Sequence, residues 1–324
     1  MTRSPSQTIA AQTAPSEPSL LSDSFVAATL VADNGAMEVA SPAACQAEPP
    51  QPEPDATTAT ATATGSLKLI HGDCLTVMQS LGQFDCIFAD PPDNLGLKYS
   101  TYCDRLPVPE YLDVLKSWFA ECVRHAPIVW FSFNAKWTAQ FGACVVDFLS
   151  REPQWEYRPC VQVFTFGQHS QRWLGNNHRP LWCINQRDAV FFPDEIRVSS
   201  WRQRNGDDRA DPRGRVPGSV FDMQYPAEPS PGDVFDFPRV PGNSKQRCDW
   251  HPTQLHQELV ERAIKLSCKT DGRVLDPFAG TGTTLRVCAR IGRDCTTIEM
   301  DQNYCEKIAA DVGLNQVSPK CWSV

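Results

Sequence analysis

Apolar residues recur along residues 66–166 in two alternating patterns. Short continuous apolar runs predict buried strands, whereas apolar side chains at helical spacing predict amphipathic helices. The predicted strands are 67–70, 84–89, 128–133 and 157–166, and the predicted helices are 75–81, 110–124 and 136–149. Strands that alternate with helices in this way predict an α/β fold, with a mostly parallel sheet that helices cover on both faces.

A further strand–helix–strand pattern lies near the C-terminal end of the chain. Residues 274–276 predict the end of a buried strand, Gly280 and Gly282 predict a tight turn, and residues 283–291 predict a helix. Neither glycine carries a Cβ, so the turn can approach a ligand closely. The next strand, 294–298, ends in Glu299. An acidic residue about 20 residues after a glycine turn is typical of nucleoside-binding sheets.

Asp276 narrows the expected ligand. The motif lacks the G-K-[ST] sequence of phosphate-binding loops, and a carboxylate at the end of the strand would repel a pyrophosphate. The same carboxylate would suit an ammonium group. The motif therefore favours an amino-acid nucleoside such as S-adenosylmethionine over NAD or ATP. The alternative is an ordinary βαβ turn that binds no ligand.

The alternating pattern stops at residue 167 and returns near residue 250. The intervening segment, 167–243, predicts a loop-rich insert, and loops of this length inside a domain are usually functional or disordered. Six arginines and no lysine lie between Arg197 and Arg215, against three acidic residues. The planar guanidinium group fits phosphates and guanine edges. We therefore expect the insert to contact nucleic acid, with a structural loop of paired surface charges as the alternative.

The first 65 residues have a different composition. They are rich in Ala, Thr, Ser and Pro, contain one aromatic residue, Phe25, and carry −6 of the net charge of −8. Such a segment cannot bury enough apolar surface to fold, so we expect a disordered tail. Residues 66–324 carry only −2, which leaves a nucleic-acid partner open.

Cysteine usage and hydropathy restrict the class of protein further. The fourteen cysteines are scattered without a C-x-x-C motif. This argues against a zinc ribbon or a thioredoxin motif and favours a reducing, cytoplasmic setting. No run of 18 apolar residues occurs, so no membrane-spanning helix is expected.

Two further motifs carry candidate chemistry. Asp90-Pro-Pro-Asp93 follows the predicted strand 84–89, and its prolines fix the backbone so that Asp90 has a defined direction. Ligands of open α/β sheets bind at this carboxyl edge of the strands. His251-Pro-Thr-Gln254 lies at the start of a helix that is predicted to run from about residue 250 to residue 267. Thr253 would cap that helix and leave backbone amides free to hold an anion.

Three motifs in this order resemble those of DNA amino-methyltransferases of the β arrangement. They are Asp90-Pro-Pro, His251-Pro-Thr-Gln and Asp276–Thr284, and the resemblance covers roughly residues 66–312. It implies a Rossmann-like methyltransferase fold in which the catalytic motif precedes the cofactor motif. It also implies methyl transfer from S-adenosylmethionine to the exocyclic amino group of a flipped base in double-stranded DNA, adenine N6 ahead of cytosine N4. No metal is required, while a homodimer and a cognate restriction nuclease stay open.

The resemblance also assigns roles to residues of this chain. Asp90 and the Pro91 carbonyl group would accept the two hydrogens of the target amine, and Glu299 would bind the cofactor ribose. The implied catalytic residues are Asp90, Pro91, Pro92 and Asp93. The implied cofactor-binding residues are Asp73, His251, Thr253, Asp276, Phe278, Gly280, Gly282, Thr283 and Glu299. The arginines expected to contact DNA, within a target-recognition insert at 167–243, are Arg172, Arg202, Arg204, Arg213 and Arg215.

Asp93 departs from the family motif, which usually has an aromatic residue there that stacks on the flipped base. Such stacking is worth about 1–3 kcal/mol per base, and a second carboxylate near Asp90 would raise one carboxyl pKa. Three explanations are open: Tyr99, Tyr102 or Trp130 supplies the ring, the substrate is an unusual base, or activity is lost. Methylation of RNA or of protein glutamine, and an inactive nucleic-acid-binding module, are the competing hypotheses.

Overall fold

The computed structural model describes residues 65–163, 172, 174, 176–217, 234–236, 240 and 246–324. All of them belong to the compact unit Thr60–Val324. The tail predicted for residues 1–65 lies outside the described residues except for Gly65. Residues 164–171, 173, 175, 218–233, 237–239 and 241–245, most of them in the expected insert 167–243, lie outside the described residues as well.

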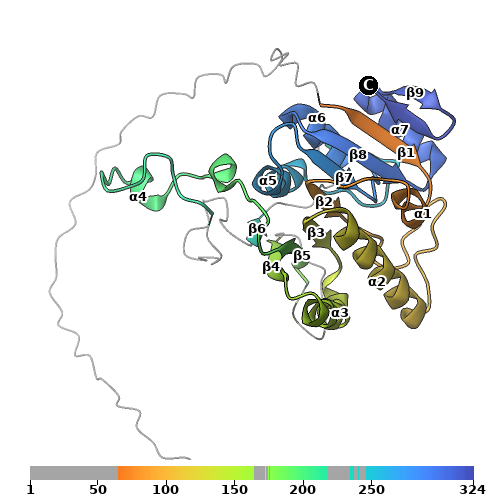
Figure 1. Ribbon diagram of the computed structural model, residues 1–324, viewed down its shortest axis with the longest axis horizontal. Helices are drawn as coiled ribbons and strands as arrows, with labels where there is room; N and C mark the ends of the chain where they lie inside the picture. Colours follow the sequence, from red (N-terminus) through yellow and green to blue (C-terminus); the bar gives the residue numbers. More distant parts are fainter. Residues whose placement is uncertain are drawn as a thin grey trace, which may run out of the picture. The chain divides into compact units, whose positions relative to one another are not determined.

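A single mixed sheet forms the centre of this unit (Figure 1). Its ten strands within the described residues follow the order β6-β4-β5-β3-β2-β7-β8-β1-β10-β9. The strands are β1 Leu67–His71, β2 Cys86–Ala89, β3 Ile128–Ser132, β4 Trp155–Val163, β5 His178–Gln186, β6 Val234–Asp236, β7 Arg273–Asp276, β8 Asp294–Glu299, β9 Asn315–Ser318 and β10 Cys321–Ser323. From β3 through β2, β7 and β8 to β1 the strands are parallel, and antiparallel pairings flank them on both sides. The predicted α/β fold is therefore confirmed, with five parallel strands at the centre of the sheet and a further parallel pair, β4 and β6, at one edge.

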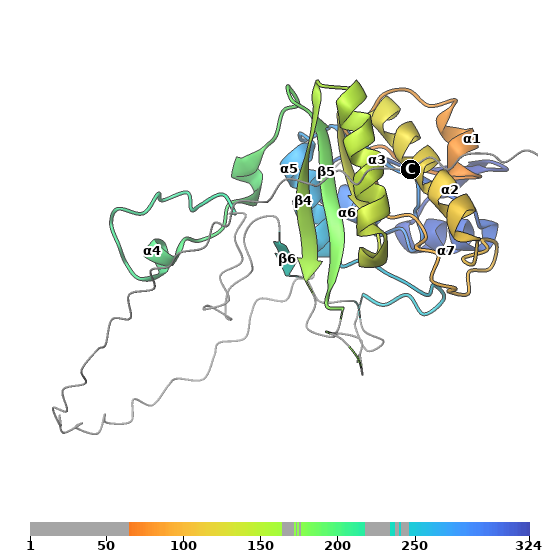
Figure 2. The same cartoon turned by 90° about the horizontal axis from the view of Figure 1, so that it is seen from below.

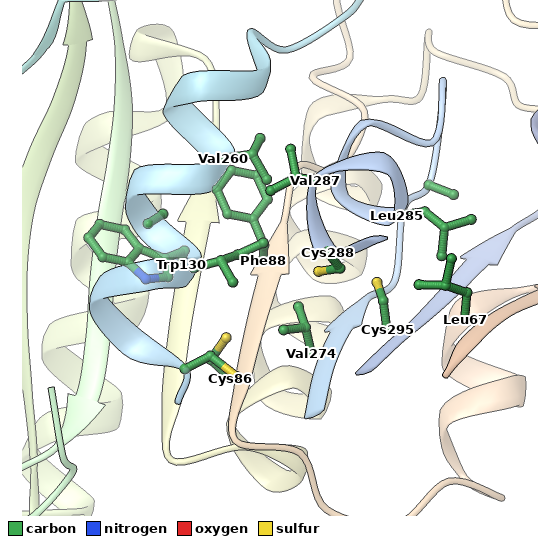
Figure 3. Packing of buried hydrophobic residues seen from close by; sticks show 14 of the residues in the cluster. Leu67, Cys86, Phe88, Trp130, Val260, Val274, Leu285, Val287, Cys288 and Cys295 are labelled. Atoms are coloured by element: carbon green, nitrogen blue, oxygen red, sulfur yellow. The ribbon is translucent and has the colours of Figure 1, made fainter. Parts of the chain in front are cut away.

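Helices cover both faces of the sheet. They are α1 Cys74–Met78, α2 Val108–His125, α3 Thr138–Arg151, α4 Trp201–Arg204, α5 Gln257–Ser267, α6 Thr283–Ile291 and α7 Gln302–Val312. In β2, Cys86 and Phe88 pack into one hydrophobic cluster with α5 and α6, whereas Ile87 and Ala89 pack into a second with α1, α2 and α3. Figure 3 shows the first cluster, in which Val260 of α5 lies beside Phe88. Figure 2 shows α5 and α3 on opposite sides of β4 and β5.

Strand β5 corrects the expected start of the loop-rich insert. The expected loop-rich insert begins at residue 167, but His178–Gln186 form a strand that pairs antiparallel with β3 and β4. Its residues 180–185 are buried, because neighbouring strands and the helices of both faces enclose it. The described loop-rich segment therefore begins only after β5. It holds one short 3₁₀ turn, Pro193–Ile196, and the four-residue helix α4.

The helix expected to begin near Trp250 begins later. Helix α5 starts at Gln257, and its N-cap residue is His256, so the predicted capping role of Thr253 is wrong. The side chain of Gln254 explains the delay. Its Oε1 accepts a hydrogen bond from the backbone N–H of Cys248 at 2.8 Å, and its amide donates to the carbonyl group of Gln246. These bonds hold the preceding residues in an irregular turn.

Sheet topology brings the two chemical motifs together. Strand β2, which precedes Asp90, pairs in parallel with β7, which ends in Asp276, through Cys86–Val274 and Ile87–Leu275. On the other side of β7 lies β8, which ends in Glu299. The carboxyl ends of parallel strands meet at one edge of a sheet. Side chains almost 190 residues apart in the sequence therefore lie at the same edge.

Candidate active site

A cavity of about 310 Å³ lies at this edge of the sheet. The predicted residues that line it are Asp73, Asp90, Pro92, His251, Thr253, Asp276, Phe278, Gly280, Thr283 and Glu299. Pro91, Asp93 and Gly282 are not in its lining. The predicted catalytic acid and most of the predicted cofactor-binding residues therefore share one cavity.

The two glycines of the turn have different surroundings. Gly280 adopts a φ of 53°, and its backbone N–H donates to Oε2 of Glu299 at 2.9 Å. Gly282 is the N-cap residue of α6 with a φ of 77°, and a Cβ there would lie 2.7 Å from Cγ2 of Ile308 in α7. Gly280 thus belongs to the cavity wall, whereas Gly282 allows two helices to pack closely.

The carboxyl groups of Asp276 and Glu299 are both held by backbone amides. The N–H of Phe278 donates to Oδ1 of Asp276 at 2.8 Å, and the N–H of Asp301 donates to Oε1 of Glu299 at 2.9 Å. Burial nevertheless raises the pKa of each carboxyl group to about 7, because the protein interior disfavours the charged form. A ligand that brings positive charge or hydroxyl donors would stabilise the ionised carboxylates.

His251 is a packing residue of the cavity wall. Its ring is buried, its centroid lies 5.6 Å from that of Tyr99 and 5.0 Å from that of Tyr304, and its Nδ1 lies 2.5 Å from the Thr253 carbonyl oxygen. Burial lowers the pKa of His251, which favours the neutral ring. The ring would also lie 3.4 Å from a Cβ at Gly280. The His251 motif therefore packs against the glycine turn.

Aromatic residues of the loop and of α2 line the same cavity. We expect the aromatic residues of α2 to be core, and Trp118 is indeed buried, yet it also lines the cavity together with Tyr99 and Tyr102. Its ring meets that of Phe278 edge-on at 5.1 Å. Trp130 lies elsewhere, in the core, where its Nε1–H donates to the Ser267 hydroxyl at 3.0 Å. Tyr99 and Tyr102 thus remain candidates for the missing stacking ring, and Trp130 does not.

Two aspartates missed in the sequence shape the loop between β2 and α2. The buried carboxylate of Asp104 accepts the backbone N–H groups of Asn94, Leu95 and Leu97 at 2.8, 3.0 and 2.9 Å. Asp301, at the start of α7, accepts hydrogen bonds from two hydroxyl groups of the same loop, those of Ser100 and Thr101. The loop therefore connects the Asp90 corner with the side of the cavity that Glu299 lines. No sequence pattern distinguished these two aspartates from surface ones.

Asp93 points away from the cavity into a buried ion-pair network. Its side chain pairs with the guanidinium group of Arg179, which also donates to Oδ1 of Asp90 at 2.6 Å. The backbone N–H of Asn134 donates to Asp93 at 2.8 Å. Burial raises the pKa of Asp93, Arg179 opposes that rise, and Asp90 adds a smaller increase. The expected second carboxylate near Asp90 is thus present, together with a cation that sequence reasoning missed.

The expected DNA-contacting arginines differ in their partners. Arg213 pairs with Asp211 at 3.0 Å, and the neighbouring Arg209 pairs with Asp207 at 2.8 Å, as the alternative of paired surface charges predicts. Arg202 lies 4.0 Å from Asp207. Arg172 and Arg204 are exposed, and Arg215 is half-buried, with its backbone paired to Val198. These arginines do not line the cavity.

The part of the chain that the structure describes was also searched for a metal site and for a membrane-spanning helix. Among those residues, no group of three or more His, Cys, Asp or Glu side chains is arranged to hold a metal ion. A separate search of the same ranges finds no helix that combines the length and the apolar character needed to cross a membrane.

Comparison with known proteins gives consistent matches over most of the chain. Residues 84–311 match the family model described as DNA methylase. The chain is 26% identical over 253 residues to the type II methyltransferase M.ScaI of Streptomyces caespitosus, covering 73% of this chain and 78% of that protein. It is 28% identical over 253 residues to the DNA adenine methyltransferase YhdJ of Escherichia coli K12, covering 73% and 79%. The solved PvuII DNA methyltransferase, cytosine-N4-specific, shares the fold with a TM-score of 0.51 at 15% identity, covering 79% of this chain and 89% of that one.

Proposed function

Because the chain belongs to the DNA methylase family, whose model matches residues 84–311, we propose that the base it methylates is adenine, at N6. The family transfers methyl groups from S-adenosylmethionine to adenine N6 or cytosine N4 in DNA. The acidic first position of the catalytic motif, Asp90, favours adenine, as the family resemblance implies. The relative YhdJ, at 28% identity, is named as an adenine methyltransferase, which supports the same choice.

One observation carries the assignment of the site: Asp90 lines the same cavity as Asp276 and Glu299. The cavity volume of about 310 Å³ falls within the range of small-molecule sites. Buried carboxyl groups with a pKa of about 7 suit a ligand that carries an ammonium group and ribose hydroxyls. We therefore assign Asp276 to the amino-acid end of S-adenosylmethionine and Glu299 to its ribose. The rings of Trp118 and Phe278 would lie beside the adenine of the cofactor.

S-adenosylmethionine supplies an electrophilic methyl group when it is bound. An aromatic exocyclic amine is a poor nucleophile, because its lone pair is conjugated into the ring. Asp90 and the Pro91 carbonyl group would accept its two hydrogens, favour a tetrahedral nitrogen and stabilise the positive charge that develops on attack. The rigid proline corner would hold the amine in line with the methyl group. The target base must leave the duplex stack to reach this site.

Segment 187–217 is the proposed contact with double-stranded DNA. Its arginines Arg202, Arg204 and Arg215, together with Arg172, have the charge and the planar geometry that phosphates require. Arg213 is a weaker candidate, because Asp211 already occupies its guanidinium group. Relatives named as type II methyltransferases also favour a cognate restriction nuclease as a partner. The homodimer that the family resemblance leaves open remains a proposal of the same kind.

Methyl transfer from labelled S-adenosylmethionine to duplex DNA tests the proposal. We expect wild type to incorporate label as N6-methyladenine, detected after digestion to nucleosides. Asp90→Ala should lose activity by at least about 100-fold, because one preorganised acceptor of the transition state is removed. Label in N4-methylcytosine would overturn the choice of base. No incorporation on any DNA, despite measurable cofactor binding by wild type, would overturn the enzymatic assignment of the site.

A further inference from the structure

Arg179 is the cation of a buried network at the catalytic corner. Its Nη2 donates to Oδ1 of Asp90 at 2.6 Å and to Oδ1 of Asp93 at 3.2 Å, and its Nη1 donates to Oδ2 of Asp93. Its Nε donates to the hydroxyl group of Ser132 at 2.6 Å. The side chain is 17% exposed, so these four bonds fix the guanidinium group away from bulk water. The two carboxylates raise the pKa of Arg179, although burial alone would lower it.

The order of strands places these groups together. Asp90 follows β2, and Ser132 is the last residue of the adjacent β3. Strand β5 runs antiparallel to β3, and Ser132 is opposite Leu181. The start of β5, where Arg179 is the second residue, therefore lies beside the carboxyl ends of β2 and β3. Strand β5 thus contributes Arg179, β3 contributes Ser132, and the segment after β2 contributes Asp90 and Asp93.

Asp93 is anchored independently of Arg179. The backbone N–H of Asn134 donates to its Oδ1 at 2.8 Å, and the Nε1–H of Trp137 donates to its carbonyl oxygen at 2.7 Å. Both partners belong to the segment that follows β3. Asp93 and Ser132 thus hold Arg179 from two sides, while Arg179 contacts the one member of the network that lines the cavity, Asp90.

We propose that Arg179 is a positioning residue for methyl transfer, and that Asp93 is the counter-ion that holds it. The inference rests on the proposed function of Asp90 as an acceptor for the target amine. Arg179 binds Oδ1 of Asp90 and so fixes the rotation of the carboxylate, which leaves Oδ2 to accept from the amine. Asp93 then has a structural reason to be acidic at the position where the family motif usually has an aromatic residue. It supplies charge for the arginine in place of a stacking surface for the base.

The network explains why a carboxylate that faces a cavity can keep one orientation. A free carboxylate side chain rotates between several positions, and small displacements of a catalytic group can lower a rate by about 100-fold. A guanidinium group is planar and always charged, so it fixes a carboxylate better than a lysine would. We therefore expect the loss of Arg179 to act on the rate at saturation, and to leave cofactor affinity unchanged.

The test is single-turnover methyl transfer at saturating DNA and cofactor, with cofactor Kd measured by titration for each variant. The variants are Arg179→Gln, Arg179→Lys and Asp93→Asn. Arg187→Gln serves as the matched control, because Arg187 lies just beyond the opposite end of β5 and is 63% exposed, and its partners are Glu156 at 3.4 Å and the Pro153 carbonyl oxygen at 3.0 Å. We expect Arg179→Gln to lower the rate by about 100-fold and to change cofactor Kd by less than about threefold. Arg179→Lys should recover part of the rate, and the control should match wild type.

The following outcomes separate this inference from its alternatives. A folded Arg179→Gln protein with the wild-type rate would overturn it, as would a rate and a cofactor affinity that fall in equal proportion. If Arg179→Gln fails to fold, Arg179→Lys and Asp93→Asn decide: a reduced rate with unchanged cofactor Kd supports the inference, and unchanged rates overturn it. A wild-type protein without methyl transfer would instead refute the proposed function.

Discussion

At the scale of single residues, Asp276 and Glu299 determine how the cavity responds to pH. Burial raises the pKa of each to about 7, whereas such side chains titrate near pH 4 in an unfolded chain. Between about pH 4 and pH 7 the folded protein holds protons that the unfolded chain has released. The contribution of both groups to stability is therefore greatest at low pH and falls as pH rises through that window. A ligand that favours the ionised carboxylates must displace those protons.

We expect the affinity for S-adenosylmethionine to increase by about tenfold between pH 6 and pH 8, because Asp276 ionises over that range. Calorimetric titration in two buffers of different ionisation enthalpy measures both the affinity and the protons released. Asp276→Asn should weaken binding and flatten the pH dependence. Asp113→Asn is the control, because this carboxylate is 78% exposed on α2. A wild-type affinity for S-adenosylmethionine that stays constant from pH 6 to pH 8 would contradict the link between cofactor binding and ionisation of Asp276.

At the scale of elements, the glycine turn is also the contact between α6 and α7. Gly282 has a φ of 77° at the N-cap of α6, and a Cβ there would lie 2.7 Å from Ile308 of α7. Gly313, at the C-cap of α7, has a φ of 76° but nothing within 4 Å of its Cβ position. A left-handed backbone conformation thus occurs both at Gly282, where a Cβ would clash with a neighbouring helix, and at Gly313, where it would not.

Gly282→Ala should destabilise the fold more than Gly313→Ala. Both substitutions incur about 1–2 kcal/mol from a left-handed backbone conformation, and Gly282→Ala adds about 1–3 kcal/mol of overpacking against Ile308. Urea unfolding followed by circular dichroism measures the two losses under the same conditions. Equal losses of unfolding free energy for the two variants would show that α7 shifts to make room for the added methyl group.

Elements that a contiguous pattern of glycines and apolar residues defines could be predicted from the sequence. Contacts that depend on how distant strands pair could not. Helix α6 matches its predicted bounds, because the glycines and the apolar spacing that define it are contiguous. Strand β5 was missed, because its apolar run, Leu181–Ile184, is short and lies inside an arginine-rich region. The contact between Arg179 and Asp93 spans 86 positions and depends on how β5 pairs with β3. Asp93 therefore departs from the family motif in the sequence, and its role follows only from its contact with Arg179.

At the scale of the whole molecule, charge must be considered segment by segment. The chain carries −8 and would be expected to avoid DNA, yet −6 of that charge lies in the first 65 residues. The arginines of segment 187–217 follow β5, whose start carries Arg179. Some of them are already neutralised, as Arg209 is by Asp207. We therefore expect DNA affinity to depend on the arginines of segment 187–217, and the total charge of the chain to matter less.

Replacing Arg202, Arg204 and Arg215 with Gln should reduce the salt dependence of DNA binding. Each lost phosphate contact lowers the slope of log K against log salt by about 0.9, so the triple variant should lose about two to three units of slope. Fluorescence anisotropy with a labelled duplex over a salt series measures this slope. Arg209→Gln is the control, since Asp207 already holds that side chain at 2.8 Å. An unchanged slope in the triple variant would remove phosphate contact as the role of this segment.

The parallel pairing of β2 with β7 has a consequence for synthesis on the ribosome. Strands β7 and β8 lie between β2 and β1 in the sheet, so the first two strands to be made each wait for a partner that is translated near the C-terminal end of the chain. Almost 190 residues separate Ala89 from Asp276, and translation at about 5–20 residues per second takes on the order of 10 to 40 seconds to cover them. During that time the apolar edge of β2 has no β7 to pair with. The nascent chain should therefore engage holding chaperones longer than a methyltransferase whose cofactor strand is translated first.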